Sequence, residues 1–123
     1  MNVYESAEDY LERILILSKS MEFVRAIDIV NDMGFSKPSV SIAMRKLKQA
    51  GYIKYIKKNH IILTKSGLEI AENIYERHQI LTQVLENLGV PSEIAKKDAC
   101  KIEHDLSPET FEALKKHYKN NLD

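Results

Sequence analysis

Apolar residues in the first part of the chain recur with the period of about 3.6 residues that is typical of helices. Three helices are predicted from this pattern, at residues 6–20, 26–32 and 36–51. Ser6 and Ser36 are suitable N-caps, and Gly34 suits the left-handed position that ends the second helix. The inward stripe of the third helix consists of Val40, Ala43, Met44 and Leu47.

After Gly51 the period changes to two residues, which is typical of β-strands. Two short strands are predicted at residues 52–56 and 61–64, joined by the polar link Lys57-Lys58-Asn59-His60. We expect His60 to be an exposed loop histidine. The strand residues expected in the core are Ile53, Ile56, Ile61 and Leu63.

Helical spacing returns in the second half of the chain. Three more helices are predicted, from Thr64 to Gly89, from Pro91 to about Asp105 and from Ser107 onward. The order helix, helix, helix, hairpin is that of a winged helix-turn-helix. The predicted fold is therefore mainly α, with a winged helix-turn-helix domain at residues 1–66 and a helical domain at residues 67–123.

The distribution of charge along the chain indicates a function for this predicted fold. The chain has 18 basic and 18 acidic residues, but the segment from Ser36 to Ser66 contains eight lysines and arginines and no acidic residue. The rest of the chain carries 10 basic against 18 acidic residues. Phosphate backbones bind through such local positive charge, whereas ordinary solvated faces usually mix signs. The sequence therefore predicts binding to double-stranded DNA.

In a helix-turn-helix, the second helix of the pair enters the major groove. The face of residues 36–51 opposite the apolar stripe should therefore contact DNA, and the hairpin tip should reach phosphate or the minor groove. Ile42 lies on that outer face and could touch a thymine methyl or complete a local core. The DNA contacts expected from this pattern are Ser36, Lys37, Ser39, Ile42, Arg45, Lys46, Lys57 and Lys58.

A second cluster has the spacing of a metal site. Cys100, Glu103 and His104 stand at positions i, i+3 and i+4, so their side chains leave one helical face. Thiolate, carboxylate and imidazole groups together are plausible ligands of a transition metal. Taken alone, Cys100 is better explained as a small buried hydrophobic residue.

Two further helices carry possible partners of this cluster. Asp9 and Glu12 stand at i and i+3 on the first helix, and His78 lies beside the apolar stripe of the long helix. His78 is either a satisfied core histidine or a ligand. Spacing alone leaves the metal site as one of two interpretations.

Three segments, in this order behind the winged helix, resemble the DtxR/MntR family of iron- and manganese-dependent repressors. They are Glu8-Asp9-Tyr10-Leu11-Glu12, Tyr75-Glu76-Arg77-His78 and Asp98-Ala99-Cys100-Lys101-Ile102-Glu103-His104. The resemblance implies a homodimer that binds palindromic operators when loaded with Mn(II) or Fe(II) and represses metal-uptake genes. It also implies a two-domain form without an SH3-like domain.

The resemblance assigns roles to particular residues. Asp9 and Glu12 match the manganese branch, whereas Cys100 matches the iron branch, so one or two metals per subunit remain open. Zn(II) and Co(II) are further candidates in vitro. Ser36 and Pro38 match base-contacting positions, which adds Pro38 to the expected DNA contacts. The implied metal ligands are Asp9, Glu12, His78, Cys100, Glu103 and His104.

The sequence disfavours several other classes of protein. The longest apolar run, Ile14 to Leu17, is too short to span a membrane, and the single cysteine fits a reducing cytoplasm. An enzyme using Cys100 and His104 would need a substrate pocket or phosphate loop, of which the sequence has no motif, so we expect neither catalysis nor a small-molecule substrate. The remaining alternative is a metal-independent winged-helix regulator with Cys100 as a redox sensor.

Overall fold

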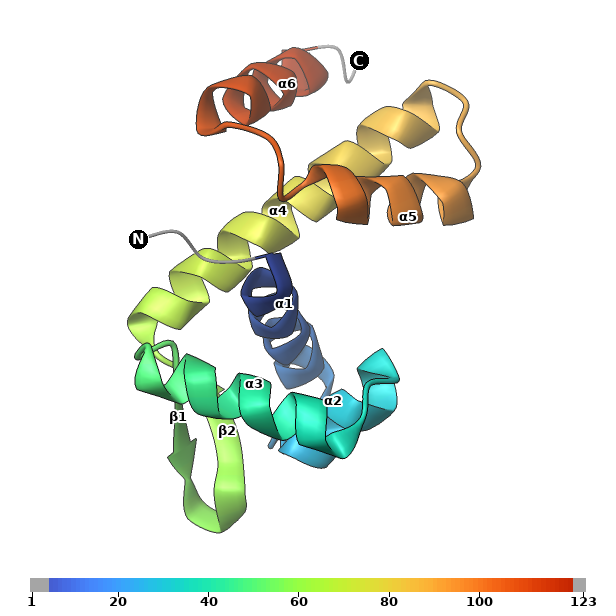
Figure 1. The fold of residues 1–123 in the computed structure, drawn as a ribbon. Coiled ribbons are helices and arrows are strands. Elements are labelled where there is room, and N and C mark those ends of the chain that lie inside the picture. Colours follow the sequence, from blue (N-terminus) through green and yellow to red (C-terminus); the bar gives the residue numbers. More distant parts are fainter. Residues whose placement is uncertain (1–4, 121–123) are drawn as a thin grey trace. The chain divides into compact units, whose positions relative to one another are not determined.

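The computed structural model describes residues 5–120 and divides into two compact units, Met1–Glu72 and Asn73–Asp123 (Figure 1). Each unit is described by itself. The boundary falls within the long helix α4 (Lys65–Asn87). The predicted domain boundary lies earlier, after residue 66, and stays a prediction.

The first unit is a helix-turn-helix followed by a two-stranded antiparallel hairpin, as predicted. Its elements are α1 (Glu5–Ser20), α2 (Ala26–Met33), α3 (Lys37–Gln49), β1 (Ile53–Ile56), the 3-10 turn η1 (Lys57–Asn59), β2 (His60–Leu63) and the start of α4. Helix α1 packs against α2, α3 and β2. The fully buried side chains of this unit include Leu11, Ile14, Ile29, Val40, Met44 and Ile53.

The turn between α2 and α3 is set by two local signals that the sequence analysis identified. Gly34 adopts the left-handed φ of 73°, and its amide donates to the Val30 carbonyl at 2.9 Å. Ser36 caps α3, accepting a hydrogen bond from the Ser39 amide at 3.2 Å. Pro38 fits in the first turn because amides there have no helical partner. These signals fix where α3 begins.

The hairpin pairs Ile53 with Leu63 and Ile56 with His60. An isolated bridge extends it, in which the Ile61 amide donates to the Val24 carbonyl at 2.7 Å. At the tip, Lys58 has the positive φ of 59°, a conformation that non-glycine residues rarely adopt. The tip is therefore a tight turn that carries two lysines.

Two predictions about the hairpin are wrong. His60 is 7% exposed, because β2 begins at this residue and its ring stacks on Phe23 at 4.1 Å between centroids. Burial, together with the positive charges of Arg25 and Lys58, lowers the pKa of His60, so the neutral ring can accept a hydrogen bond from Arg25 Nη2 at 3.2 Å. Ile56 is exposed, since strand alternation places it on the face opposite Ile53.

Helix α1 begins at Glu5, so Ser6 lies inside it, and the position that would cap it lies outside the described residues. None of the described helices is long and apolar enough to cross a membrane.

The second unit consists of the rest of α4 with α5 (Ser92–Ile102) and α6 (Pro108–Asn120). Its buried apolar residues are Ile74, Leu81, Ala95, Ala99 and Phe111. Leu88, which directly follows α4, is exposed. Helix α5 ends at Ile102, earlier than predicted, although Glu103 keeps helical dihedral angles and its amide donates to the Ala99 carbonyl at 2.9 Å. The predicted helical spacing of Cys100 and Glu103 is thereby preserved.

Gly67 provides a test of the packing between α4 and the chain that enters β1. A Cβ atom at this position would overlap the carbonyl oxygen of Tyr52, and this backbone group cannot move aside cheaply. We expect Gly67→Ala to lower the free energy of unfolding by about 2 kcal/mol or more. Gly34→Ala, where only the positive φ is strained and no atom is near, should cost about 1 kcal/mol. Urea unfolding followed by circular dichroism measures both, and equal losses would contradict this account.

Candidate metal centre and DNA-binding surface

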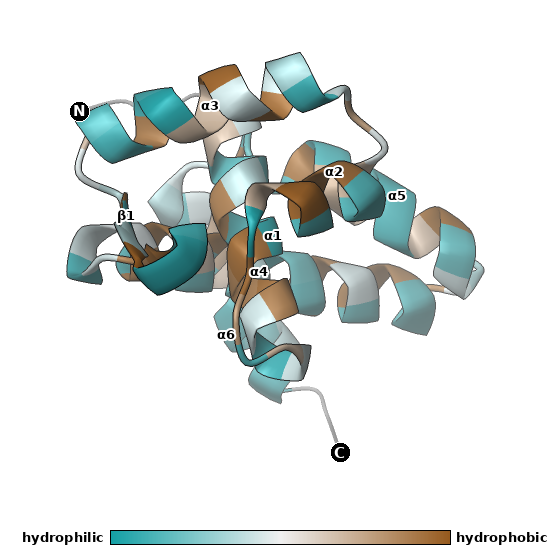
Figure 2. Ribbon diagram, turned by 90° about the horizontal axis from the view of Figure 1, so that it is seen from below, coloured by the Kyte–Doolittle hydropathy of each residue, from teal (hydrophilic) through white to brown (hydrophobic). Residues whose placement is uncertain are grey.

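The outer face of α3 is exposed as predicted. Figure 2 shows hydrophobic and hydrophilic residues interleaved along this helix, with Val40, Met44 and Leu47 buried. Ile42 is 48% exposed, which disfavours a role in the local core. Ser41 is exposed too, although the expected DNA contacts did not include it. The predicted DNA contacts Ser36, Lys37, Pro38, Ser39, Ile42, Arg45, Lys46, Lys57 and Lys58 are all exposed.

Two serines at the start of α3 differ in what they can offer a base. The Ser36 hydroxyl donates to the Ser39 hydroxyl at 2.8 Å while accepting from the Ser39 amide. Its hydrogen is therefore committed to the cap. Ser39 accepts that hydrogen bond and keeps its own hydroxyl hydrogen for donation to an acceptor on a base edge.

The second unit contains a carboxylate with no exposed surface. Glu103 Oε2 accepts a hydrogen bond from His78 Nδ1 at 3.0 Å. Its other oxygen, Oε1, lies 3.5 Å from His104 Nε2 and accepts no hydrogen bond within the described residues. A buried charge that is only partly hydrogen-bonded is costly, because it has lost its hydration. The site therefore favours a positive partner for Glu103.

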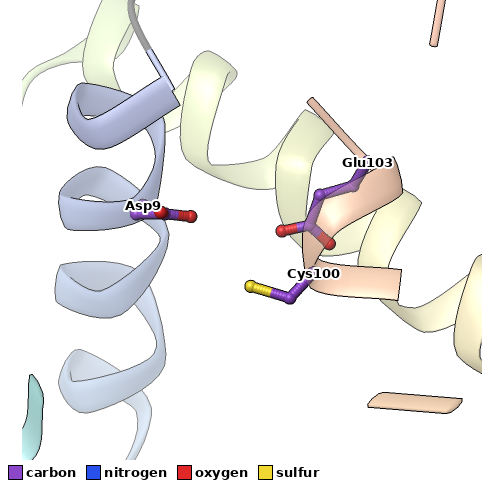
Figure 3. A group of neighbouring side chains, drawn as sticks. All are labelled: Asp9, Cys100 and Glu103. Carbon is purple, nitrogen blue, oxygen red and sulfur yellow. The ribbon is translucent and has the colours of Figure 1, made fainter. Parts of the chain in front are cut away.

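Three elements of this unit hold the side chains of the site. His78 lies on α4, Cys100 on the last turn of α5, and Glu103 and His104 follow directly after that helix. Cys100 is partly buried, and the His104 side chain is almost fully buried. Figure 3 draws the side chains of Cys100, on α5, and of Glu103, directly after that helix, and also that of Asp9 on α1. Within the second unit, the structure thus places His78 and His104 within 3.5 Å of the Glu103 carboxylate, and their role as metal ligands stays a prediction.

The other two predicted ligands belong to the first unit. Asp9 is partly buried and Glu12 is buried, and both lie on α1 at positions i and i+3. The side chain of Arg13, next along this helix, pairs with Asp32 of α2 at 3.2 Å. Asp9 and Glu12 are thus held on a helix that packs into the core of the DNA-binding fold.

The available donors fit a divalent transition metal. Carboxylates and imidazoles suit Mn(II) and Fe(II), and a thiolate shifts preference toward softer ions. The unbonded oxygen of the buried Glu103 is the kind of atom that a cation would satisfy. A histidine that donates from one ring nitrogen to a carboxylate, as His78 does, is also a common arrangement around metals.

Arg77 supports the backbone of the candidate site, a role that no sequence motif indicated. Its Nη1 donates to the carbonyl of Glu103 at 2.9 Å and to that of Leu106 at 2.7 Å, and its guanidinium lies 5.3 Å from the Phe111 ring centroid. Arg77 therefore fixes the backbone that carries Glu103 and His104. The resemblance included the Arg-His pair, but neither motif nor spacing indicated this task.

A helix-turn-helix with a basic hairpin, joined to a helical unit that buries metal-type ligands, is the architecture of a metal-responsive DNA-binding regulator. The profile described as iron dependent repressor, N-terminal DNA binding domain, matches residues 2–61. That described as iron dependent repressor, metal binding and dimerisation domain, matches residues 64–121.

Relatives agree with these matches. The transcriptional regulator MntR of Escherichia coli O157:H7 is 36% identical over 111 residues, covering 90% of this chain and 72% of that protein. An uncharacterized HTH-type transcriptional regulator of Methanocaldococcus jannaschii is 34% identical over 113 residues, covering 90% of each. The chain belongs to the DtxR/MntR family of metal-dependent transcriptional repressors. These relatives are transcriptional regulators, which is a DNA-binding role rather than an enzymatic one.

Solved structures show the same fold. The manganese regulator SloR superposes with a TM-score of 0.82 at 29% identity, covering 97% of this chain and 55% of that one. A manganese-dependent transcriptional repressor in complex with manganese gives 0.80 at 27% identity, covering 88% and 50%. ScaR with bound Zn²⁺ gives 0.77 at 27% identity, covering 92% and 53%. The chain spans about half the length of these three structures.

The role of Arg77 is testable by substitution. Arg77→Met keeps the apolar stem but leaves two carbonyl groups without their donor, so we expect a loss of about 2 kcal/mol in the free energy of unfolding. Affinity for Mn(II) should fall as well, because Glu103 and His104 lose their support. Lys97→Met, at an exposed position on α5, is the matched control. Urea unfolding measures the stability of both variants, and titration measures their metal affinity. Equal losses in Arg77→Met and Lys97→Met would contradict this role.

Proposed function

We propose that this chain is a DNA-binding repressor of metal-uptake genes that binds its operator when loaded with Mn(II) or Fe(II). The observation that carries the proposal is the fully buried Glu103 carboxylate, which lies between two histidines and has one oxygen without a hydrogen bond from any described residue. Family membership supports it, since the relatives are metal-dependent repressors.

The proposed ligands are Asp9, Glu12, His78, Cys100, Glu103 and His104. A bound divalent cation would supply the positive charge that lets these anionic side chains approach one another. Asp9 and Glu12 would then tie α1, part of the DNA-binding fold, to the helical domain. In the absence of that charge, the carboxylates repel one another and α1 is less restrained. Metal binding thereby favours one position of the reading helix.

The donor set favours manganese slightly over iron. Asp9 and Glu12 are hard oxygen ligands, which suit Mn(II), whereas Cys100 is the soft member that favours Fe(II), Zn(II) or Co(II). Affinity in vitro follows the Irving–Williams order, so the metal that binds most tightly is not thereby the cellular one. Glu103 would be among the residues that hold the metal, whether one or two ions are bound per subunit.

The DNA side of the proposal uses α3 and the hairpin tip. Ser39, Ile42 and Arg45 would read base edges, while the lysines neutralise phosphates. A homodimer would present two such helices to a palindromic operator, because protein two-fold symmetry matches operator symmetry. The remaining residues proposed to contact DNA are Ser36, Lys37, Pro38, Lys46, Lys57 and Lys58.

The first test is operator binding by chelated protein, with its own upstream region as the fluorescent probe. We expect Mn(II) or anaerobic Fe(II) to tighten binding at least tenfold, and His104→Ala or Glu103→Gln to remove most of this gain because the ligand set is broken. His117→Ala and Glu109→Gln replace exposed residues of α6 and serve as matched controls. Zn(II) is titrated in parallel to rank the metals.

Equal binding in chelator and in excess metal would refute the proposed function. If binding responded instead to peroxide, and Cys100→Ser abolished that response, the alternative of a metal-independent redox regulator would replace it. Alkylation of Cys100 in chelator separates the metal-dependent function from the redox alternative. Only the redox alternative predicts that alkylation changes operator binding when no metal is present.

The wing lysines give a separate prediction. Replacing Lys57 and Lys58 with glutamine should weaken binding to specific and unrelated DNA alike. The slope of log K against log salt should become shallower by about 0.9 for each phosphate that the variant no longer neutralises. Lys96→Gln/Lys97→Gln, an adjacent exposed pair on α5, is the control. A slope unchanged by the wing variant excludes the hairpin tip as a phosphate-binding element.

A further inference from the structure

One aromatic contact joins the proposed ligand helix to the start of the reading helix. Tyr10 of α1 and Phe35, in the turn before α3, meet edge to face, with ring centroids 5.9 Å apart and an interplanar angle of 68°. Tyr10 is 7% exposed, whereas Phe35 is 48% exposed. A half-exposed phenylalanine is therefore held in place on one side by a ring that is fixed in the core.

Tyr10 lies next to proposed metal ligands in the chain, and Phe35 lies next to the N-cap of α3. Tyr10 directly follows Asp9 and stands two residues before Glu12, so the proposed ligands flank it on α1. Phe35 directly precedes Ser36, the N-cap of α3. The contact thus spans the short distance between the proposed metal ligands of this unit and the first turn of the helix proposed to read bases.

The turn around Phe35 is stiff enough to pass on a displacement. On one side the Gly34 amide is hydrogen-bonded to the Val30 carbonyl, and on the other Ser36 is bonded to Ser39. Packed side chains and helix caps change between discrete arrangements rather than deforming smoothly. A shift of Tyr10 would therefore move Phe35 and the start of α3 together.

We propose that the Tyr10–Phe35 contact couples metal binding at α1 to the position of α3, so that both residues are positioning residues for operator binding. This inference rests on the proposed function. Edge-to-face pairs are strong enough to change an equilibrium several-fold. Coupling of this kind is reciprocal, so operator should also tighten metal binding through the same contact.

The test measures a ratio: operator affinity at saturating Mn(II) divided by operator affinity in chelator. Phe35→Leu keeps an apolar side chain but removes the ring contact, and we expect it to lower this ratio about two- to tenfold. Tyr10→Leu should do the same. The double variant should lose no more than either single variant, because all three break one contact. Mn(II) affinity without DNA, measured by calorimetry, should stay near that of the unmodified protein in Phe35→Leu.

Two controls isolate the contact. Tyr10→Phe retains the ring and should retain the ratio. Phe23→Leu removes another half-exposed phenylalanine of the same unit, one that stacks on His60 rather than on α1, and should retain the ratio as well. Thermal unfolding of each variant in chelator checks that the fold is kept. Phe35→Leu is the safer variant because Phe35 is half exposed.

Three outcomes overturn the inference. An unchanged ratio in Phe35→Leu shows that the contact carries no coupling. Equal loss of affinity with and without metal shows that Phe35 touches DNA or supports α3 statically. If the unmodified protein shows no metal dependence, the proposed function fails and takes the inference with it. If the unmodified protein binds operator in a metal-dependent way and the variants keep the same affinity ratio, the inference is overturned while the proposed function stands.

Discussion

The fully buried carboxylate of Glu103 is the constraint on which the second unit depends. Its position is fixed from the backbone, because Arg77 holds the Glu103 carbonyl and the end of α5 continues in helical geometry. The backbone from which the Glu103 side chain extends is therefore held in place. One oxygen is satisfied by His78, and the other accepts no hydrogen bond in the part of the chain that the structure describes. A fold that keeps a partly satisfied carboxylate in its interior is more stable with a cation there, since binding to the folded state alone adds to stability.

The buried Glu103 carboxylate would not by itself distinguish one divalent metal from another. In the proposed site, Glu103 and the histidines would accept any divalent transition ion, so they would provide affinity without selectivity. Selectivity would have to come from ligands that differ in softness, and of the proposed ligands Cys100 and Asp9 would favour different ions. A site that combined both would be selective through its coordination geometry and through the supply of each metal in the cell, rather than through the strength of any single ligand.

Much of the fold was predictable because its signals are local. Ser36 and Gly34 cap neighbouring helix ends through bonds to residues three or four positions away, so the sequence shows them directly. His60 and Arg77 were not predictable in this way. The burial of His60 depends on Phe23, which is distant in sequence, and Arg77 binds backbone carbonyls, which have no residue identity to recognise. Spacing placed Cys100, Glu103 and His104 on one helical face, whereas only the family resemblance made His78 their partner. The part that these residues, Asp9 and Glu12 play in metal binding is still a proposal.

The segregation of charge also limits how a metal could act on DNA binding. Eight basic residues between Ser36 and Ser66 attract phosphate locally, and the acidic remainder does not cancel them because salt screens charges beyond about 8 Å at physiological ionic strength. By the same screening, a cation surrounded by anionic ligands adds little field at a distant phosphate. Long-range attraction is therefore a weak means of activation. What remains is mechanical coupling through packed side chains, which does not decay with salt and which acts where α3 begins.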